Sequence, residues 1–225
     1  MVDRFKKDIT FVIATRKGSK RIKNKNIRKF GNSNLLEIKL KQIKRIIKKP
    51  IILLSSDCKT SQKIGKNNGA IVDMRPKKFA TDNVPMKAVY KYLAKKVDSQ
   101  YICYLHVTSP FLKDKTLKQS IAKFFQNKKK FDSLATVTSV KEYLWYRNKP
   151  INYNPKNHPR SQTLPDYVAL NFAVNIVSTT YMRNEGRIVG ENFYPINLDF
   201  PESLDIDYQW QFNLGNLLAK KNWQK

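Results

Sequence analysis

The sequence predicts an α/β protein built on a mostly parallel β-sheet with helices on both faces. Short, β-branched apolar runs alternate along the chain with stretches whose apolar residues recur at helical spacing. This alternation is typical of strands joined by crossover helices. Of the 225 residues, 41% are hydrophobic and 12% aromatic, so the chain can bury a sizeable core and is not disordered. No Gly/Ser-rich linker divides it, and residues 1–225 are expected to form one domain.

Five strands are predicted in the first 140 residues, each at a short apolar run rich in β-branched residues. They cover 9–14, 51–54, 70–72, 101–107 and 133–140. Helices are expected between them, because apolar residues recur there three or four positions apart. The residues that mark these helices are Leu36, Leu40, Ile43 and Ile47, then a weaker pattern up to Asn68 and Gly69, then Met86, Val89 or Tyr90, Leu93 and Val97, then Leu117, Ile121 and Phe124 or Phe125. Pro50 should stop the first helix, and Asp114 is expected to cap the fourth.

The alternation of strand and helix stops after Val140. Residues 141–170 are polar and aromatic, include four prolines and show no helical period. A structureless stretch this long is unusual inside a compact domain, and an excursion that packs against a second subunit would explain it. A strand is expected to resume at 171–177. The final helix is marked by Phe212, Leu214 or Gly215, Leu217 and Leu218.

Three polar segments directly follow predicted strands. They are the cationic loop 16–26, Ser55-Ser56-Asp57 and Thr108-Ser109-Pro110. Because the carboxyl ends of parallel strands meet at one edge of a sheet, these segments should gather there. That edge is where open α/β folds bind their ligands.

The net charge of +27 does not by itself indicate a nucleic-acid-binding protein. Of the 44 basic residues, 34 are lysine, a residue favoured by A+T-rich codons, and they are scattered along the chain. Nucleic-acid readers depend on arginine for base edges and on aromatic residues for stacking. A solvated lysine coat is therefore the favoured interpretation. Two cysteines make neither a disulfide framework nor a zinc pattern, and the apolar runs are too short to span a bilayer. Without a credible secretion signal, the cytoplasm is the expected location.

The charge is unevenly distributed between two segments. The first fifty residues carry 17 basic and 3 acidic side chains, and the cationic loop lies among them. Residues 188–219 contain no Lys, Arg or His, where the average composition predicts about six, and they carry five acidic residues. Cations for phosphate oxygens and carboxylates for Mg²⁺ are what a metal-bound nucleoside triphosphate requires.

The acidic pair Asp205 and Asp207 is the candidate metal site. In an extended segment, side chains two positions apart point the same way, and two carboxylates held together repel unless a cation lies between them. The alternative is that Asp207 caps the final helix. The absence of basic residues from 188–219 favours metal binding over capping. Neither G-x-G-x-x-G nor G-x-x-x-x-G-K-[ST] is present, and two histidines, His106 and His158, are too few for a zinc site.

Six motifs in sequence order resemble those of one enzyme family. The segment from Ala14 to Ile22, ATRKGSKRI, followed by Lys25-Asn26-Ile27, resembles the signature of the acylneuraminate cytidylyltransferases, the CMP-sialic acid synthetases. The further motifs are Ser55-Ser56-Asp57, Arg75-Pro76 with Ala80-Thr81-Asp82, Thr108-Ser109-Pro110, Leu164-Pro165 with Asn171, and Ser203-Leu204-Asp205-Ile206-Asp207. The resemblance extends along nearly the whole chain.

The resemblance implies a Rossmann-like nucleotidyltransferase fold whose residues 141–170 form a dimerisation excursion, and hence a homodimer. The implied reaction joins CTP to a nine-carbon 2-keto sugar acid, giving the CMP-sugar and pyrophosphate, with Mg²⁺ as cofactor. Residues implied for CTP are Arg16, Ser19, Lys20, Lys25, Asn26, Arg75 and Asp82. Mg²⁺ would be bound by Asp205 and Asp207, and catalysis would fall to Arg16, Lys25 and Asp207. Sugar-side candidates are His106, Thr108, Ser109, Arg160, Gln162 and Asn171.

Departures from the family pattern are concentrated on the sugar side. His106-Val107 stands where Gln-Pro is usual, Ala169-Leu170 where Arg-Pro is common, and Phe172 where Gly follows the asparagine. CTP chemistry is therefore better supported than N-acetylneuraminate as the acceptor. Arg160 and Gln162 are candidates for the acceptor's carboxylate, although Arg160 could instead hold the excursion. Three alternatives stay open: a 3-deoxy-manno-octulosonate cytidylyltransferase, a lysine-rich RNA-binding protein, and a non-catalytic relative that binds a nucleotide.

Overall fold

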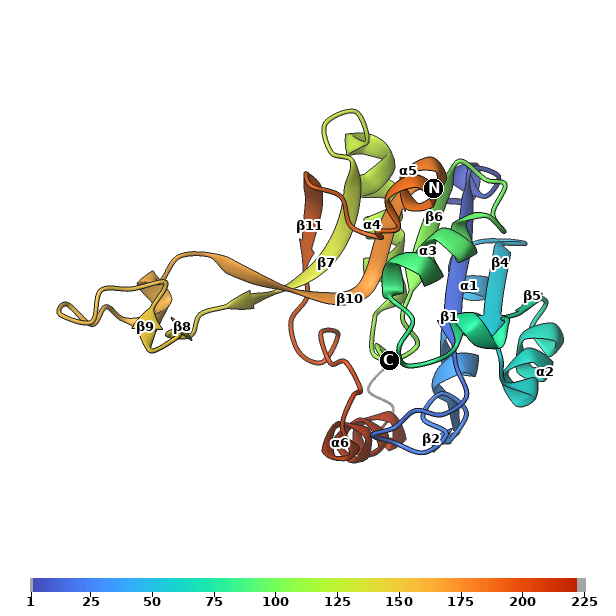
Figure 1. Cartoon of the computed structure of the whole chain (residues 1–225), viewed down its shortest axis with the longest axis horizontal. Coiled ribbons are helices and arrows are strands. Elements are labelled where there is room, and N and C mark those ends of the chain that lie inside the picture. The colour runs from blue at the N-terminus through green and yellow to red at the C-terminus, as the bar shows by residue number, and fades with distance from the viewer. Residues whose placement is uncertain (1, 222–225) are drawn as a thin grey trace.

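A seven-stranded sheet forms the centre of the computed structural model, which describes residues 2–221 (Figure 1). The strands lie in the order β11-β7-β10-β6-β1-β4-β5. Their bounds are β1 Ile9–Thr15, β4 Ile51–Ser56, β5 Ile71–Met74, β6 Tyr101–Leu105, β7 Ser133–Val140, β10 Tyr167–Ser178 and β11 Phe193–Asn197. Neighbouring strands are parallel except at β10, which is antiparallel to both β6 and β7. The predicted mostly parallel sheet is confirmed.

Helices cover both faces of this sheet, as the sequence predicts. They are α1 Leu35–Ile46, α2 Lys59–Asn67, α3 Met86–Ala94, α4 Asp114–Asn127, α5 Thr179–Glu185 and α6 Gln209–Lys220, with short 3₁₀ turns η1 Val2–Phe5, η2 Lys77–Phe79 and η3 Ser161–Thr163. Two hydrophobic cores lie against the sheet, and successive side chains of β1 point alternately into one and the other. Phe11 and Ile13 belong to the core that includes α1, α4 and α6, whereas Val12 packs with α3 and α5. All three side chains are fully buried.

Several predicted boundaries need correction. Asp114 does not cap α4: Lys113 is the N-cap, and the Asp114 carboxylate instead pairs with Arg45 at 2.8 Å. His106 follows β6 rather than lying in it, because the chain leaves the sheet there towards the loop that holds Thr108. The strand expected at 171–177 begins earlier, at Tyr167, where it pairs with Val140.

Residues 141–166 form an arm that projects from the body of the molecule (Figure 1). The arm was expected to be structureless, but it contains η3 and a two-stranded hairpin of β8 (Trp145–Tyr146) and β9 (Lys149–Pro150). Its aromatic side chains explain this order, since Tyr143 stacks on His158 with ring centroids 4.7 Å apart. A second small hairpin, β2 (Lys29–Phe30) and β3 (Ser33–Asn34), precedes α1.

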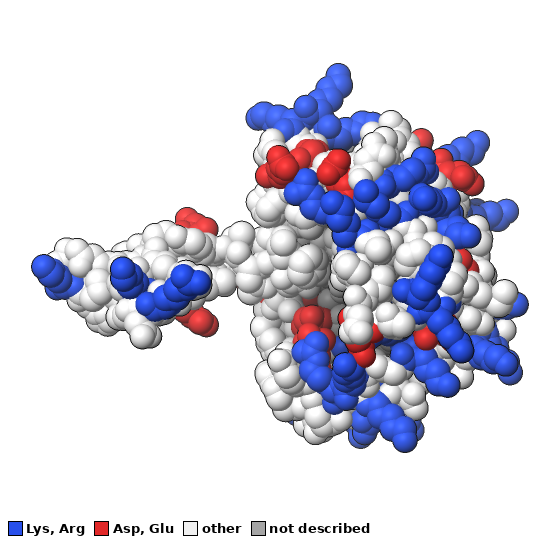
Figure 2. Space-filling view, in the orientation of Figure 1, with Lys and Arg blue, Asp and Glu red and all other residues white. Residues whose placement is uncertain are grey.

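Lysine and arginine side chains are spread over the body and the tip of the arm on the face seen in Figure 2. On this face the basic side chains are dispersed, as in a solvated lysine coat. Across residues 2–221, no helix has both the length and the apolar character needed to cross a membrane.

Candidate active site

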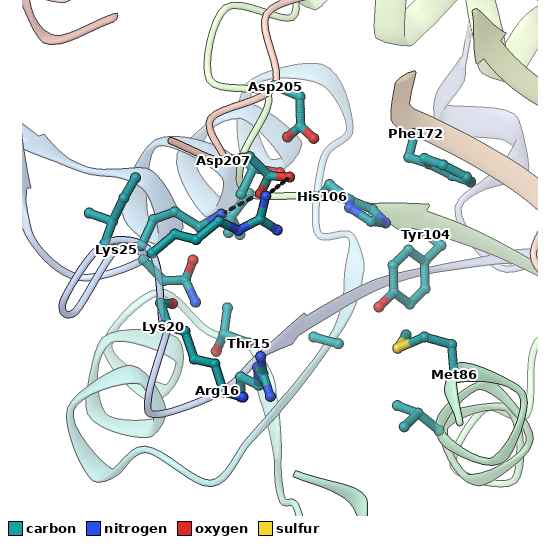
Figure 3. A pocket seen from close by; sticks show the side chains of 18 of the residues that line it. Thr15, Arg16, Lys20, Lys25, Met86, Tyr104, His106, Phe172, Asp205 and Asp207 are labelled. Atoms are coloured by element: carbon teal, nitrogen blue, oxygen red, sulfur yellow. Dashed lines mark hydrogen bonds and ion pairs between the residues drawn. The ribbon is translucent and has the colours of Figure 1, made fainter. Parts of the chain in front are cut away.

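A pocket of about 560 Å³ lies at the carboxyl edge of the sheet, where the sequence places its polar segments (Figure 3). It receives side chains from the end of β1, the cationic loop, the loop after β6, β10 and the acidic segment before α6. A volume in this range suits a small-molecule ligand. Ten of the sequence-predicted residues line it: Arg16, Ser19, Lys20, Lys25, Asn26, Arg75, His106, Thr108, Asp205 and Asp207.

The cationic loop is held against the sheet by contacts at its base. The backbone N–H of Lys17 donates to Asp57 Oδ1 at 2.7 Å, which ties the loop to the end of β4. Thr15 Oγ1 donates to Ser56 Oγ at 3.0 Å between the same two strand ends. Further along the loop, Ile22 is buried in the core, so the charged residues on either side of it are carried on an anchored segment.

Arg16 and Lys20 converge on one carboxylate at the rim of the pocket. Lys20 Nζ lies 2.9 Å from Asp82 Oδ2, and Arg16 Nη1 pairs with Asp82 Oδ1. Hydrogen bonds from Lys20 and Arg16 hold the pKa of Asp82 below its usual value. Asp82 itself is exposed and contacts these two cations from outside the pocket lining. The cations remain about a third or more exposed and can therefore turn to an anionic ligand.

Asp207 is bound by two cations of the same loop. Lys25 Nζ lies 2.9 Å from Asp207 Oδ1, and Arg21 Nη1 lies 3.1 Å from Asp207 Oδ2. Partial burial acts to raise the pKa of Asp207, but the hydrogen bond from Lys25 and the charges of Lys25 and Arg21 lower it overall. Asp207 therefore stays ionised at neutral pH. It does not cap α6, whose N-cap is Tyr208.

Asp205 faces the same pocket in a different environment. Its Oδ1 atom is buried and has no hydrogen-bond partner among residues 2–221, and burial raises the pKa of this carboxyl. Between the two acids, Ile206 is fully buried, and its N–H donates to the Thr108 carbonyl at 2.8 Å. The Ile206 carbonyl accepts a hydrogen bond from Lys25 Nζ at 2.6 Å. Because Ile206 is anchored on both sides of its peptide, the two aspartates lie on the pocket side as the alternation predicts.

The acidic pair fits a magnesium ion by its chemistry. Mg²⁺ is usually held by one or two carboxylates together with substrate phosphates and water. Asp205 supplies a buried oxygen that lacks a partner, and Asp207 supplies an ionised carboxylate. Within residues 2–221, no cluster of three or more His, Cys, Asp or Glu side chains is arranged to hold a metal.

Arg75 lines the pocket and makes three hydrogen bonds to the protein through Nε and Nη2. Its side chain is buried, and Nη2 donates to the carbonyls of Thr15 and Ser55 at 2.8 and 2.6 Å. Nε donates to Ser55 Oγ at 3.1 Å. The guanidinium thus joins the carboxyl ends of β1 and β4, and it supports the pocket floor.

The predicted sugar-side residues are not all brought together. His106 and Thr108 line the pocket, whereas Ser109 is buried outside the lining. Asn171 is also outside the lining, and its Nδ2 donates to Thr138 Oγ1 at 2.9 Å. Arg160 and Gln162 are exposed on the arm and are absent from the pocket of this chain.

Nine residues of the pocket lining were not among the predicted site residues, and four of them bring rings, a thioether or a charge to it. Tyr104 and Phe172 contribute aromatic rings, Met86 contributes a thioether at the start of α3, and Arg21 pairs with Asp207 (Figure 3). Arg21 could have been found, because it lies within the cationic loop. Tyr104 could not, since its position in an apolar strand is typical of a core residue.

The chain matches the family model described as "Cytidylyltransferase" over residues 10–156. Among curated proteins, it is 22% identical to "Post-translational flagellin modification protein B" of Campylobacter coli, with 96% of this chain and 97% of that protein covered. It is 31% identical to "Pseudaminic acid cytidylyltransferase" of Campylobacter jejuni, and that alignment covers 56% of each chain.

Among solved structures, the fold is similar to that of CMP:2-keto-3-deoxy-manno-octonic acid synthetase, solved in complex with CTP. The TM-score is 0.69 over 95% of this chain and 98% of that one, with 11% sequence identity. The likeness confirms the Rossmann-like α/β fold.

Proposed function

Since this chain belongs to the cytidylyltransferase family, we propose that it couples CTP to a sialic-acid-like nonulosonic acid, giving the CMP-sugar and pyrophosphate. One observation carries the proposal: a single pocket joins the cationic loop to the acidic pair Asp205 and Asp207. Similarity to a protein named pseudaminic acid cytidylyltransferase supports a sugar acid of this class as acceptor. The proposal treats residues 1–225 as one catalytic domain.

The proposed reaction is attack of the acceptor's anomeric hydroxyl on the α-phosphorus of CTP, with pyrophosphate leaving. Negative charge builds on the phosphate oxygens as the bond to pyrophosphate breaks. Arg16, Ser19 and Lys20 would hold the triphosphate at the rim, with Asn26 on the nucleoside side. Asp82 would position Arg16 and Lys20, and Arg75 would support the pocket floor. Lys25 would stabilise the developing charge, because its ammonium is largely buried and already positioned by Ile206 and Asp207.

Asp205 and Asp207 are proposed to hold Mg²⁺, which when bound would neutralise charge on the phosphate oxygens. Asp207 has a second proposed role as acceptor of the hydroxyl proton, because it is ionised at neutral pH. His106 is not proposed as a base or as a cationic contact. Burial lowers the pKa of His106 to about 4, so the imidazole is neutral at pH 7.

The test of this function is pyrophosphate release from CTP and MgCl₂ with a panel of 2-keto sugar acids. We expect release that depends on CTP, on the metal and on a nonulosonic acid, and little release with 3-deoxy-manno-octulosonate. Preference for the octulosonate would refute the acceptor class but not the reaction. Absence of release with every acceptor, together with absence of Mg²⁺-dependent CTP binding, would refute the function.

Asp207→Ala tests the acidic pair in the same assay. We expect kcat to fall at least about 100-fold, because an ionised group that meets the reacting phosphate is lost. Asp199→Ala is the matched control, since Asp199 is an exposed acid of the same base-free segment and lies outside the pocket. Full activity in Asp207→Ala would remove its metal and catalytic assignments. Circular dichroism checks that both variants stay folded.

We further propose that the enzyme works as a homodimer built through the arm. Trp145, Tyr146 and Ile151 on the arm are each at least half exposed, which is unusual for large apolar residues on one small projection. In a dimer, Arg160 and Gln162 of the arm could serve as contacts for the acceptor's carboxylate.

A further inference from the structure

Phe172 has a backbone conformation that bulky residues rarely adopt. Its φ is +58°, in the left-handed region that favours glycine. It lies within β10 at an irregularity, where the pairing with β7 shifts register between Leu170 and Asn175. Backbone strain of this kind persists only where the surrounding structure enforces it, and it is concentrated at functional sites.

Side-chain hydrogen bonds enforce this conformation. Asn175 Nδ2 donates to the Phe172 carbonyl at 3.2 Å. On the other side, Asn171 Oδ1 accepts from the N–H of Ala173 at 3.3 Å, while Asn171 Nδ2 donates to Thr138. These contacts fix the bulge on both sides of Phe172, so its ring cannot return to an ordinary strand position without breaking them.

The bulge directs the Phe172 ring into the pocket, where it completes what we call the aromatic wall: Tyr104, His106 and Phe172 (Figure 3). Phe172 stacks on His106 with ring centroids 5.7 Å apart and planes 22° apart. Tyr104 makes an edge contact with His106, with ring centroids 5.3 Å apart. The buried Nε2 atom of His106 has no hydrogen-bond partner in the described part of the chain, residues 2–221. The wall therefore offers ring surface to the pocket, while the unpartnered Nε2 atom of His106 is buried.

The order of strands separates this wall from the cations. The wall comes from β10 and from the end of β6, whereas Arg16 and Lys20 follow β1, which lies on the other side of β6. Figure 3 shows Arg16 and Lys20 on one side of the pocket and the three rings on the other. In a transfer at phosphorus, the attacking and leaving oxygens lie roughly in line. With pyrophosphate leaving towards the cations, the attacking acceptor approaches from the side of the wall.

We propose that Phe172 is a specificity-determining residue, and that the aromatic wall selects acceptors with an apolar C–H or methyl surface. The inference rests on the proposed function and adds the chemistry of the acceptor that this pocket prefers. A deoxy carbon or terminal methyl group packs on ring faces without losing hydrogen bonds, whereas a hydroxyl placed there would be desolvated.

Phe172→Gly tests this inference, because glycine removes the ring and adopts φ near +58° without strain. We expect the acceptor KM to rise at least tenfold, the CTP KM to stay within twofold, and the melting temperature to stay equal or rise. Two acceptors that differ only in carrying a methyl or a hydroxymethyl group measure the selectivity. The ratio of their kcat/KM values, in favour of the methyl acceptor in the wild type, should be at least tenfold smaller in Phe172→Gly. Phe172→Tyr keeps the ring and should restore the acceptor KM. If the glycine variant folds poorly, Phe172→Asn replaces it, because asparagine also adopts this backbone conformation, and the same rise in the acceptor KM is expected.

Two results would overturn the inference. An unchanged acceptor KM in Phe172→Gly and Phe172→Asn would show that the wall does not touch the acceptor. A rise in the CTP KM alone would assign the wall to the cytosine base. These outcomes differ from failure of the proposed function, in which the wild-type protein itself releases no pyrophosphate with any sugar acid.

Discussion

Lys39 is a fully buried lysine beneath the loop that carries Thr108 into the pocket. Its Nζ donates to Gln42 Oε1 at 2.9 Å and to the Ser109 carbonyl at 3.0 Å. Burial lowers the pKa of Lys39 to about 7, from 10.5 for a solvated lysine. The folded protein therefore releases this proton near pH 7, and the unfolded chain keeps it to about pH 10. Between those values the unfolded state binds more protons, so stability rises with pH.

Lys39→Met should remove this pH dependence. The free energy of unfolding of the wild type, minus that of the variant, should increase by about 3 kcal/mol between pH 6 and pH 9. Urea unfolding at a series of pH values measures it. Lys41→Met is the control, because Lys41 lies on the same helix with its side chain about half exposed, and its profile should parallel the wild type. Parallel profiles for Lys39→Met would mean that Lys39 is not the group that titrates.

At the residue scale, the sequence singled out charged residues that the structure brings together in one pocket. Arg16 and Lys25 belong to the cationic loop that follows a strand, and Asp207 lies in a segment without basic residues. Both signals can be found in the local sequence. The pocket-facing ring of Phe172 depends on a bulge in β10, which no local pattern records. The same bulge involves Asn171, which was predicted to contact the sugar and whose side-chain hydrogen bonds brace the strand.

At the scale of elements, helices with a regular apolar period were predicted and confirmed. The helix α5 escaped because its seven residues follow β10 at once, with Ser178 as N-cap and only two buried side chains. The strand β11 escaped because it contains Pro195, which argues against a central strand. Its position at the edge of the sheet explains why that proline is tolerated.

Helix α6 is placed by a close contact that only glycine allows. A Cβ atom at Gly215 would lie 2.9 Å from Phe30 Cζ and 3.2 Å from Ile206 Cδ1. Ile206 sits between the two aspartates of the site, and its backbone contacts Thr108 and Lys25. The packing of α6 is thus coupled directly to the position of the acidic pair.

Gly215→Val should disturb both the fold and the site. We expect the free energy of unfolding to fall by about 1–3 kcal/mol through overpacking. The pyrophosphate-release rate should fall as well, because a displaced Ile206 moves Asp205 and Asp207. Leu217→Val, at a position of the same helix that is 60% exposed, should change stability by less than about 0.5 kcal/mol. Wild-type stability and activity in Gly215→Val would contradict the coupling.

At the scale of the whole molecule, the position of the arm was predicted from the sequence, but its internal structure was not. The prolines of residues 141–166 and the missing helical period predicted an excursion, yet the aromatic packing that orders it joins side chains far apart along the arm. Tyr143, for example, contacts Tyr153 and His158. A segment ordered by its own contacts that exposes Trp145, Tyr146 and Ile151 is suited to meet a second copy of the chain.

Removing the arm tests whether it makes the dimer. Val140 and Tyr167 are direct partners across β7 and β10, so an Asn-Gly turn can replace residues 141–166 and close the hairpin. By light scattering after gel filtration, the wild type should show twice the 26.3 kDa chain mass, and the shortened protein should show a monomer's mass. Circular dichroism and the melting curve control for the fold, because the sheet register is kept. A monomeric wild type, or a shortened protein that stays dimeric, would contradict the proposed role, since in either case the apolar surface of the arm would not join two copies.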